Sequence, residues 1–177
     1  MERKRLQTVG FVFTVVTGTL LHFIYEWSGE SSFVGAFSAV NESVWEHLKL
    51  LAVPMLLFAV VEYFIYGRKQ ENFIAVRFIS ILLGMAVIIS VFYTYSGILG
   101  RKFLAVDILL FIFAVYVAYR FSNRMLQTDR FSSELAKGLA LAGIFLLLTC
   151  FALFSFVPPR IGIFRDSTTG AYGITPK

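Results

Sequence analysis

Cysteine, histidine and charge are all scarce in this chain, and each scarcity excludes a class of protein. Charged residues make up 15% of the 177 residues, whereas a soluble domain carries about 25%. The single cysteine, Cys150, lies in an apolar run, so neither an intramolecular disulfide nor a thiolate cluster can form. Only two histidines occur, and they form neither an HExxH nor an HxxxH zinc signature.

Long apolar runs dominate what remains. Hydrophobic residues make up 58% of the chain, and the mean hydropathy is +0.76. Five runs have about the 20 residues that a helix needs to cross a bilayer. They predict an all-α, polytopic transmembrane bundle in the cell membrane, forming one domain over residues 1–177. The predicted spans are residues 6–27, 43–66, 72–95, 103–121 and 134–157, followed by a tail at 158–177.

The distribution of basic residues indicates the membrane topology. A net charge of +5 and a pI near 9.5 are also typical of nucleic-acid binding. Here, however, the Lys and Arg residues lie in short loops between apolar runs, where they set orientation and contact anionic headgroups. Ten lie on the side of the N-terminus and six on the other side. We therefore expect the N-terminus inside, the C-terminal tail outside, and membrane lipids rather than nucleic acid as partners.

Polar and ionisable residues gather where the predicted spans meet the outer surface. Ionisable groups at that depth are unfavourable unless they are paired, hydrated or bound to a ligand. Five crossings bring both histidines and most membrane-embedded acids to this one face. The residues of this zone are His22, Glu26, Asn41, Glu42, Glu46, His47, Tyr93, Asp107 and Asp166.

This combination of side chains predicts a metal site. Imidazole and carboxylate groups on facing helices can supply three or four ligands in a helical bundle. Without thiolates, such a set suits a divalent metal, zinc first, then manganese or iron. A remaining carboxylate would serve as general base. The predicted metal ligands are His22, His47, Glu26 and Asp107, with Glu46 as a further oxygen candidate, and the predicted catalytic groups are Glu42 and Glu46.

The same residues have structural interpretations. Ser43 and Glu46 form a capping-box pattern, and Glu46 and Lys49 are spaced for an ion pair. A hydrogen-bonded polar network without metal explains the cluster equally well. Tyr93 either donates to the cluster or lies in the interfacial aromatic belt. The tail around Asp166 is either a lid over the site or a solvated turn.

Three motifs resemble those of one protein family. They read LHFIYEWSG at 21–29, VNESVWEHLK at 40–49 and IFRDSTTGAYGI at 163–174. Together they are similar to a family of small bacterial integral-membrane proteins classed as a domain of unknown function. The resemblance implies a membrane protein of this size and implies no activity.

Three functions remain open at this stage. The first is a metal-assisted intramembrane hydrolase or transferase acting on a lipid-type substrate. Its chemistry is similar to that of the seven-helix ceramidase and progestin-receptor-like membrane hydrolases, although this chain has two spans fewer and lacks their paired-histidine motif. The alternatives are a cation- or proton-coupled transporter or channel component, and a non-catalytic membrane partner protein.

Overall fold

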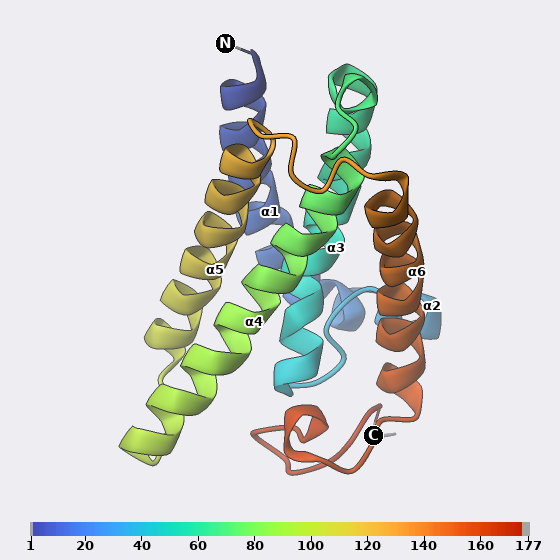
Figure 1. Ribbon diagram of the computed structural model, residues 1–177. Coiled ribbons are helices and arrows are strands. Elements are labelled where there is room, and N and C mark those ends of the chain that lie inside the picture. Colours follow the sequence, from blue (N-terminus) through green and yellow to red (C-terminus); the bar gives the residue numbers. More distant parts are fainter. Residues whose placement is uncertain (1, 175–177) are drawn as a thin grey trace.

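The computed structural model describes residues 2–174, and every regular element in that range is helical (Figure 1). The five predicted spans are confirmed, because five helices are long and apolar enough to cross a membrane. These are α1 (Glu2–Trp27), α3 (Val44–Ile65), α4 (Phe73–Leu99), α5 (Leu104–Met125) and α6 (Glu134–Phe156). The short elements are α2 (Ser32–Gly35), η1 (Gly67–Lys69) and η2 (Gly162–Phe164).

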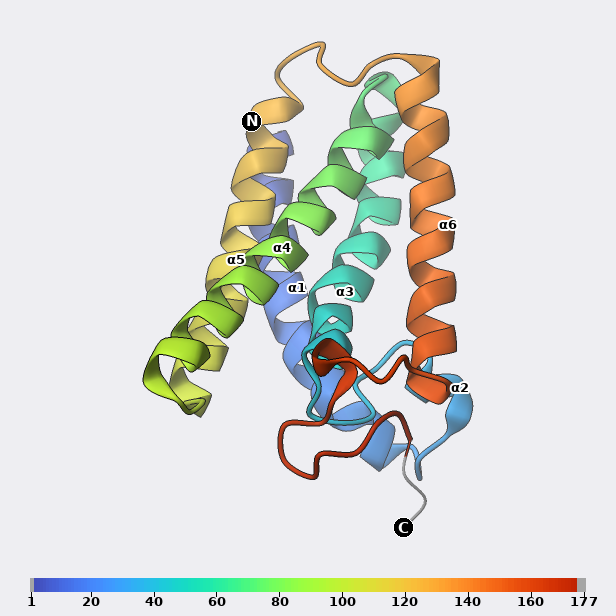
Figure 2. The same ribbon diagram turned by 60° about the horizontal axis from the view of Figure 1, so that its bottom comes forward.

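Helix α3 is the centre of the bundle. Within its most apolar stretch it is 61% buried, against 17% to 44% for the other four long helices. Figures 1 and 2 show α3 between α1 and α6, with α4 crossing beside it. The N-terminal end of α1 and the α5–α6 connection lie at one end of the bundle. The α2 segment, the α4–α5 turn and the tail lie at the other.

Two helices end later in the sequence than hydropathy predicts. Helix α4 continues past residue 95 to Leu99, where Gly100 ends it in the left-handed conformation at φ 68°. Helix α5 continues past residue 121 to Met125, with Arg124 in its last turn. A basic side chain there is favourable beside the unpaired carbonyls of a helix end. The helices therefore end where their capping residues lie, not where the apolar runs stop.

A glycine allows α1 to approach α3 closely. Pro54 has no N–H, so the carbonyl of Leu50 cannot receive the usual helical hydrogen bond from it. Gly18 of α1 lies directly against this carbonyl, since a Cβ built on Gly18 would be 2.3 Å from the Leu50 oxygen. Because any side chain would collide there, only glycine permits this contact. His22 lies one turn further along α1, and the contact brings it beside the start of α3.

A buried ion pair holds the site end of the bundle together. Lys49 of α3 is 0% exposed and donates to the carboxylate of Glu46 at 2.6 Å. Its three N–H groups are shared with the hydroxyl of Ser155 at 2.5 Å and the carbonyls of Gly35 and Ser38 at 2.9 and 3.0 Å. The Ser155 hydroxyl in turn lies 3.0 Å from Glu46 Oε1. One ammonium thus connects α3, α6 and the segment between α1 and α3.

Candidate metal centre

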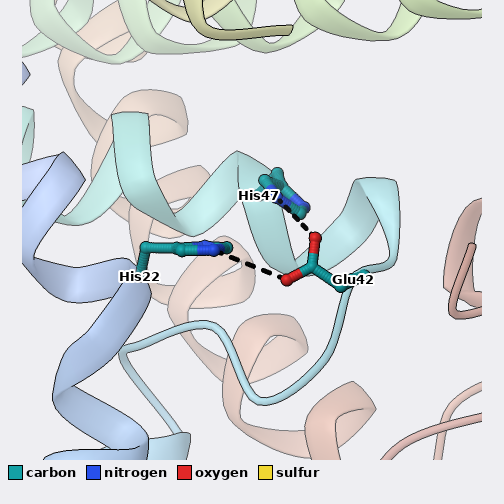
Figure 3. A group of neighbouring side chains, drawn as sticks. All are labelled: His22, Glu42 and His47. Atoms are coloured by element: carbon teal, nitrogen blue, oxygen red, sulfur yellow. Dashed lines mark ion pairs between the residues drawn. The ribbon is translucent and has the colours of Figure 1, made fainter. Parts of the chain in front are cut away.

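Three segments bring two imidazoles and one carboxylate together (Figure 3). His22 comes from α1, Glu42 from the loop before α3, and His47 from the first turn of α3. His22 Nε2 lies 3.4 Å from Glu42 Oε1, and His47 Nε2 lies 3.6 Å from Glu42 Oε2. The ring centroids of the two histidines are 5.3 Å apart. The His/carboxylate cluster predicted from topology is therefore present.

The capping residues of α3 place these side chains. Ser43 is the N-cap and accepts a hydrogen bond from the Glu46 N–H at 3.3 Å, as its capping pattern predicts. Asn41 Oδ1 accepts from the Ser43 N–H at 2.9 Å, which stabilises the turn just before the helix. Glu42 lies in this turn, outside the helix, and can therefore face α1. His47 lies one turn into the helix and faces the same space.

The tautomer of His47 suits metal binding. His47 Nδ1 lies 2.8 Å from the Ser43 carbonyl oxygen, which can only accept, so Nδ1 donates to it. This leaves the lone pair of Nε2 directed toward Glu42, the arrangement of metal-binding histidines whose second nitrogen donates to a carbonyl. His22 Nδ1 is buried and has no hydrogen-bond partner within residues 2–174. The free lone pair of His47 is thus aimed at the shared space.

The separations within the cluster are close to those between the ligands of a tetrahedral zinc ion. Two ligand atoms at about 2.0–2.1 Å from such an ion lie roughly 3.3–3.5 Å from each other. Each imidazole faces a different oxygen of Glu42, with His22 Nε2 3.4 Å from Oε1 and His47 Nε2 3.6 Å from Oε2. One ligand atom from each of the three residues lies within 4.8 Å of the other two. The side chains of His22, His47 and Glu42 are 29%, 34% and 42% exposed. Such partial exposure leaves one side open, as in catalytic rather than structural zinc sites.

The other predicted carboxylates lie outside this cluster. Glu26 is exposed one turn beyond His22 and adds negative charge beside it. Glu46 is 1% exposed and paired with Lys49. Asp107 accepts a hydrogen bond from the Tyr95 hydroxyl at the α4–α5 turn. Among residues 2–174, the three-residue group that could hold a metal comprises His22, Glu42 and His47.

The C-terminal tail folds back onto the loop that carries Glu42. Asp166 Oδ2 accepts from the Glu42 N–H at 3.1 Å, and the Ser167 hydroxyl donates to the Glu42 carbonyl at 2.8 Å. Asn41 Nδ2 donates to the Gly173 carbonyl at 3.0 Å. Tyr93, 43% exposed, lies beside η2 of the tail. The tail therefore forms hydrogen bonds with both the N–H and the carbonyl of Glu42, the candidate carboxylate ligand.

Comparison with known proteins identifies the family. The profile of a family of unknown function, DUF6512, matches residues 1–174. The chain belongs to this family. No curated protein and no solved structure matches it. The predicted resemblance to an uncharacterised family is confirmed, and the matched range includes all three motifs and the whole candidate metal centre.

Two residues at this end of the bundle, Ser155 and Ser167, were not predicted from the sequence. Ser155 lies in the apolar run of α6, and nothing in its spacing connects it with Lys49 106 residues earlier. Ser167 is one of several small polar residues in the tail, and its contact with Glu42 depends on how the tail folds back. The third motif contains Ser167, which is the one sequence signal that could have indicated it.

Asp166→Asn is expected to release the tail. Burial of the Asp166 carboxyl opposes ionisation, but hydrogen bonds from the N–H groups of Thr169, Glu42 and Thr168 outweigh it and hold the pKa below 3.8. A lowered folded-state pKa means that the stabilisation is present above pH 3.8 and is lost as the pH falls through the lowered value. The neutral amide should abolish this pH dependence and weaken docking at pH 7.

Limited trypsin digestion measures this effect. Arg160 and Arg165 are exposed in the tail, and we expect roughly tenfold faster cleavage there in Asp166→Asn, as for the loss of one charge-assisted hydrogen bond. Asp129→Asn, in the α5–α6 loop at the other end of the bundle, is the matched control and should leave the rate unchanged. Equal cleavage of both variants would contradict the role of Asp166.

Proposed function

We propose that this multi-pass protein of the cell membrane binds one divalent metal ion, zinc by preference, at His22, Glu42 and His47. We further propose that it uses the ion for hydrolysis or group transfer on a lipid-type substrate. The observation that carries the proposal is that one ligand atom each from His22, Glu42 and His47 lies within 4.8 Å of the other two, around a partly open space. Two imidazoles and one carboxylate leave a fourth position for water or substrate.

The depth of the site supports a lipid substrate. His22 lies five residues before the end of α1 at Trp27, which is about 7.5 Å at the helical rise of about 1.5 Å per residue. This distance from the end of a span corresponds to the boundary between hydrocarbon and headgroups. The ester and phosphate groups of lipids lie at that boundary. A substrate could therefore present its reactive group without leaving the bilayer.

The geometry favours a different division of roles from that predicted by sequence. Glu42 lies between the two imidazoles, and this position suits a ligand better than a general base. Glu26 is exposed one turn beyond His22 and is free to accept a proton from an attacking water. A bound zinc ion would supply Lewis-acid activation of the scissile group. Glu42 and the histidines would hold it, and Glu26 would move the proton.

A transport function finds less support. A polar route inward from His22 along α1 would have to pass Gly18 before it reaches Thr14. A Cβ on Gly18 would lie 2.3 Å from the Leu50 carbonyl and 2.7 Å from the ring of Phe111. The space between these positions is therefore filled by packed atoms. This closed contact favours chemistry at the surface over passage of an ion.

Metal analysis combined with an activity assay tests the proposal. Protein purified in detergent should contain about one zinc ion per chain, as expected for one three-ligand site. Hydrolysis of a panel of fluorogenic lipid esters and phosphodiesters should be lost after chelation and restored by zinc. Absence of metal from protein reloaded with zinc would overturn the whole proposal. Stoichiometric zinc without turnover of any panel member would overturn its catalytic part.

A further inference from the structure

A cavity of about 420 Å³ lies between α3, α4 and α6, and no residue of the metal centre lines it. Its wall consists almost wholly of apolar and aromatic side chains, including Val53, Leu57 and Val60 of α3 and Ile144 of α6. Helix α6 packs mainly on α4 and only lightly on α3. The volume lies within the range of about 300–1,000 Å³ that is usual for ligand sites.

One buried cation lines this apolar cavity. Arg77 of α4 is 2% exposed, and its Nη2 pairs with Glu62 and donates to the Tyr66 hydroxyl at 3.1 Å. Its Nε and Nη1 have no hydrogen-bond partner in the described part of the chain. Buried donors without an acceptor are unfavourable. The described residues thus supply no hydrogen-bond acceptor for these two nitrogens, although the rings of Phe73 and Tyr119 lie 5.5 and 5.3 Å from the guanidinium carbon.

The surroundings of Arg77 decide what kind of acceptor fits. Glu62 also accepts hydrogen bonds from Gln7 at 3.0 Å and from Tyr66 at 2.9 Å, which stabilise its negative charge. The Arg77–Glu62 pair is thus neutral as a unit. An anion beside it would leave an unbalanced buried charge, which is strongly unfavourable. An uncharged oxygen, such as an ester carbonyl, satisfies the free N–H groups without that penalty.

Two further cations lie at the same end of the cavity. Arg68 in η1 is exposed, and its guanidinium lies 5.9 Å from the ring of Tyr63, which lines the cavity. Lys137 lies in the first turns of α6, one turn before Leu141, another lining residue. Its contact with Glu134 is 3.5 Å long and solvent-exposed, so it leaves the ammonium available. Basic side chains at a membrane surface attract anionic headgroups.

We propose that this cavity binds one glycerophospholipid with an anionic headgroup. One acyl chain lies along the apolar wall between α3 and α6. Its ester carbonyl accepts from Arg77 after the guanidinium turns toward the cavity, because the free nitrogens are buried in the observed position. Arg77 is four residues into α4, which places it below the surface at the depth of lipid esters. The phosphate then lies near Arg68 and Lys137. This site is independent of the proposed metal centre.

Native mass spectrometry of detergent-purified, delipidated protein tests the assignment. The protein is incubated with equal amounts of phosphatidylglycerol and phosphatidylcholine, and retained lipid is counted. We expect one retained lipid per chain, with phosphatidylglycerol preferred roughly tenfold to thirtyfold, because each of two surface cations contributes roughly fivefold. Equal retention of the two lipids, or no retained lipid, would overturn the proposal.

Three variants distinguish lipid bound in the cavity from lipid that merely surrounds the protein. Ile144→Trp fills the cavity from α6 and should remove the retained lipid. Combined Arg68→Gln and Lys137→Gln should reduce the preference for phosphatidylglycerol to about twofold or less. Combined Arg101→Gln and Arg160→Gln removes two exposed cations at the other end of the bundle, and should leave the preference unchanged. If Ile144→Trp retains as much lipid as the wild type, the retained lipid lies around the protein and not in the cavity, and the proposal is overturned.

Discussion

Lys49→Met is expected to lower the free energy of unfolding by about 3–5 kcal/mol, the usual effect of removing one partner of a buried ion pair. The side chains of Lys49 and Glu46 are 0% and 1% exposed, so solvent screening does not reduce the effect. The substitution leaves the Glu46 carboxylate buried without its counter-ion. It also leaves the carbonyls of Gly35 and Ser38 without the ammonium that now donates to them.

Unfolding of the purified protein in detergent, followed by circular dichroism, measures the effect. Lys137→Met is the matched control, since Lys137 and Glu134 have the same i,i+3 spacing with side chains 41% and 86% exposed. Exposed pairs of this kind contribute at most about 1 kcal/mol. Combined Lys49→Met and Glu46→Leu should recover part of the loss, because the charge without a partner is gone. Equal stability of Lys49→Met and Lys137→Met would refute the interpretation.

His47→Ala is expected to weaken zinc binding by more than about 100-fold. Loss of a residue that merely orients a ligand weakens metal binding by about 10–100-fold, and His47 is proposed to be a ligand itself. His22→Ala should have a similar effect, since both Nε2 atoms face the same carboxylate. Competition with a fluorescent zinc chelator in detergent gives the dissociation constants.

Asp107→Asn is the control for this comparison. Asp107 is a carboxylate at the outer membrane face and was predicted from the sequence to be a metal ligand. In the structure it instead accepts a hydrogen bond from Tyr95, outside the cluster. Its substitution should change the zinc affinity by less than about threefold, as for an independent site. If Asp107→Asn weakens binding as much as His47→Ala, the ligand set is wrong. If neither histidine variant weakens binding, the metal centre itself is refuted.

The five spans are a property of the sequence because a membrane helix satisfies its own backbone hydrogen bonds. Length and hydropathy therefore locate each span without knowledge of its neighbours. The number of crossings then places His22 at the same face as residues 41–49. For this reason the His/carboxylate cluster was predictable. The family membership was also predictable, from motifs that lie at this one face.

Only the tertiary structure decided what each carboxylate does. Glu42 and Glu46 lie one turn apart in sequence and have the same chemistry. Glu46 enters α3 and faces α6, where Lys49 and Ser155 enclose it, whereas Glu42 stays in the preceding turn and faces His22. That difference depends on the rotation of α3 about its axis and on the tail that holds Glu42 in place. Both are set by contacts between segments more than 100 residues apart, which periodicity and spacing do not encode.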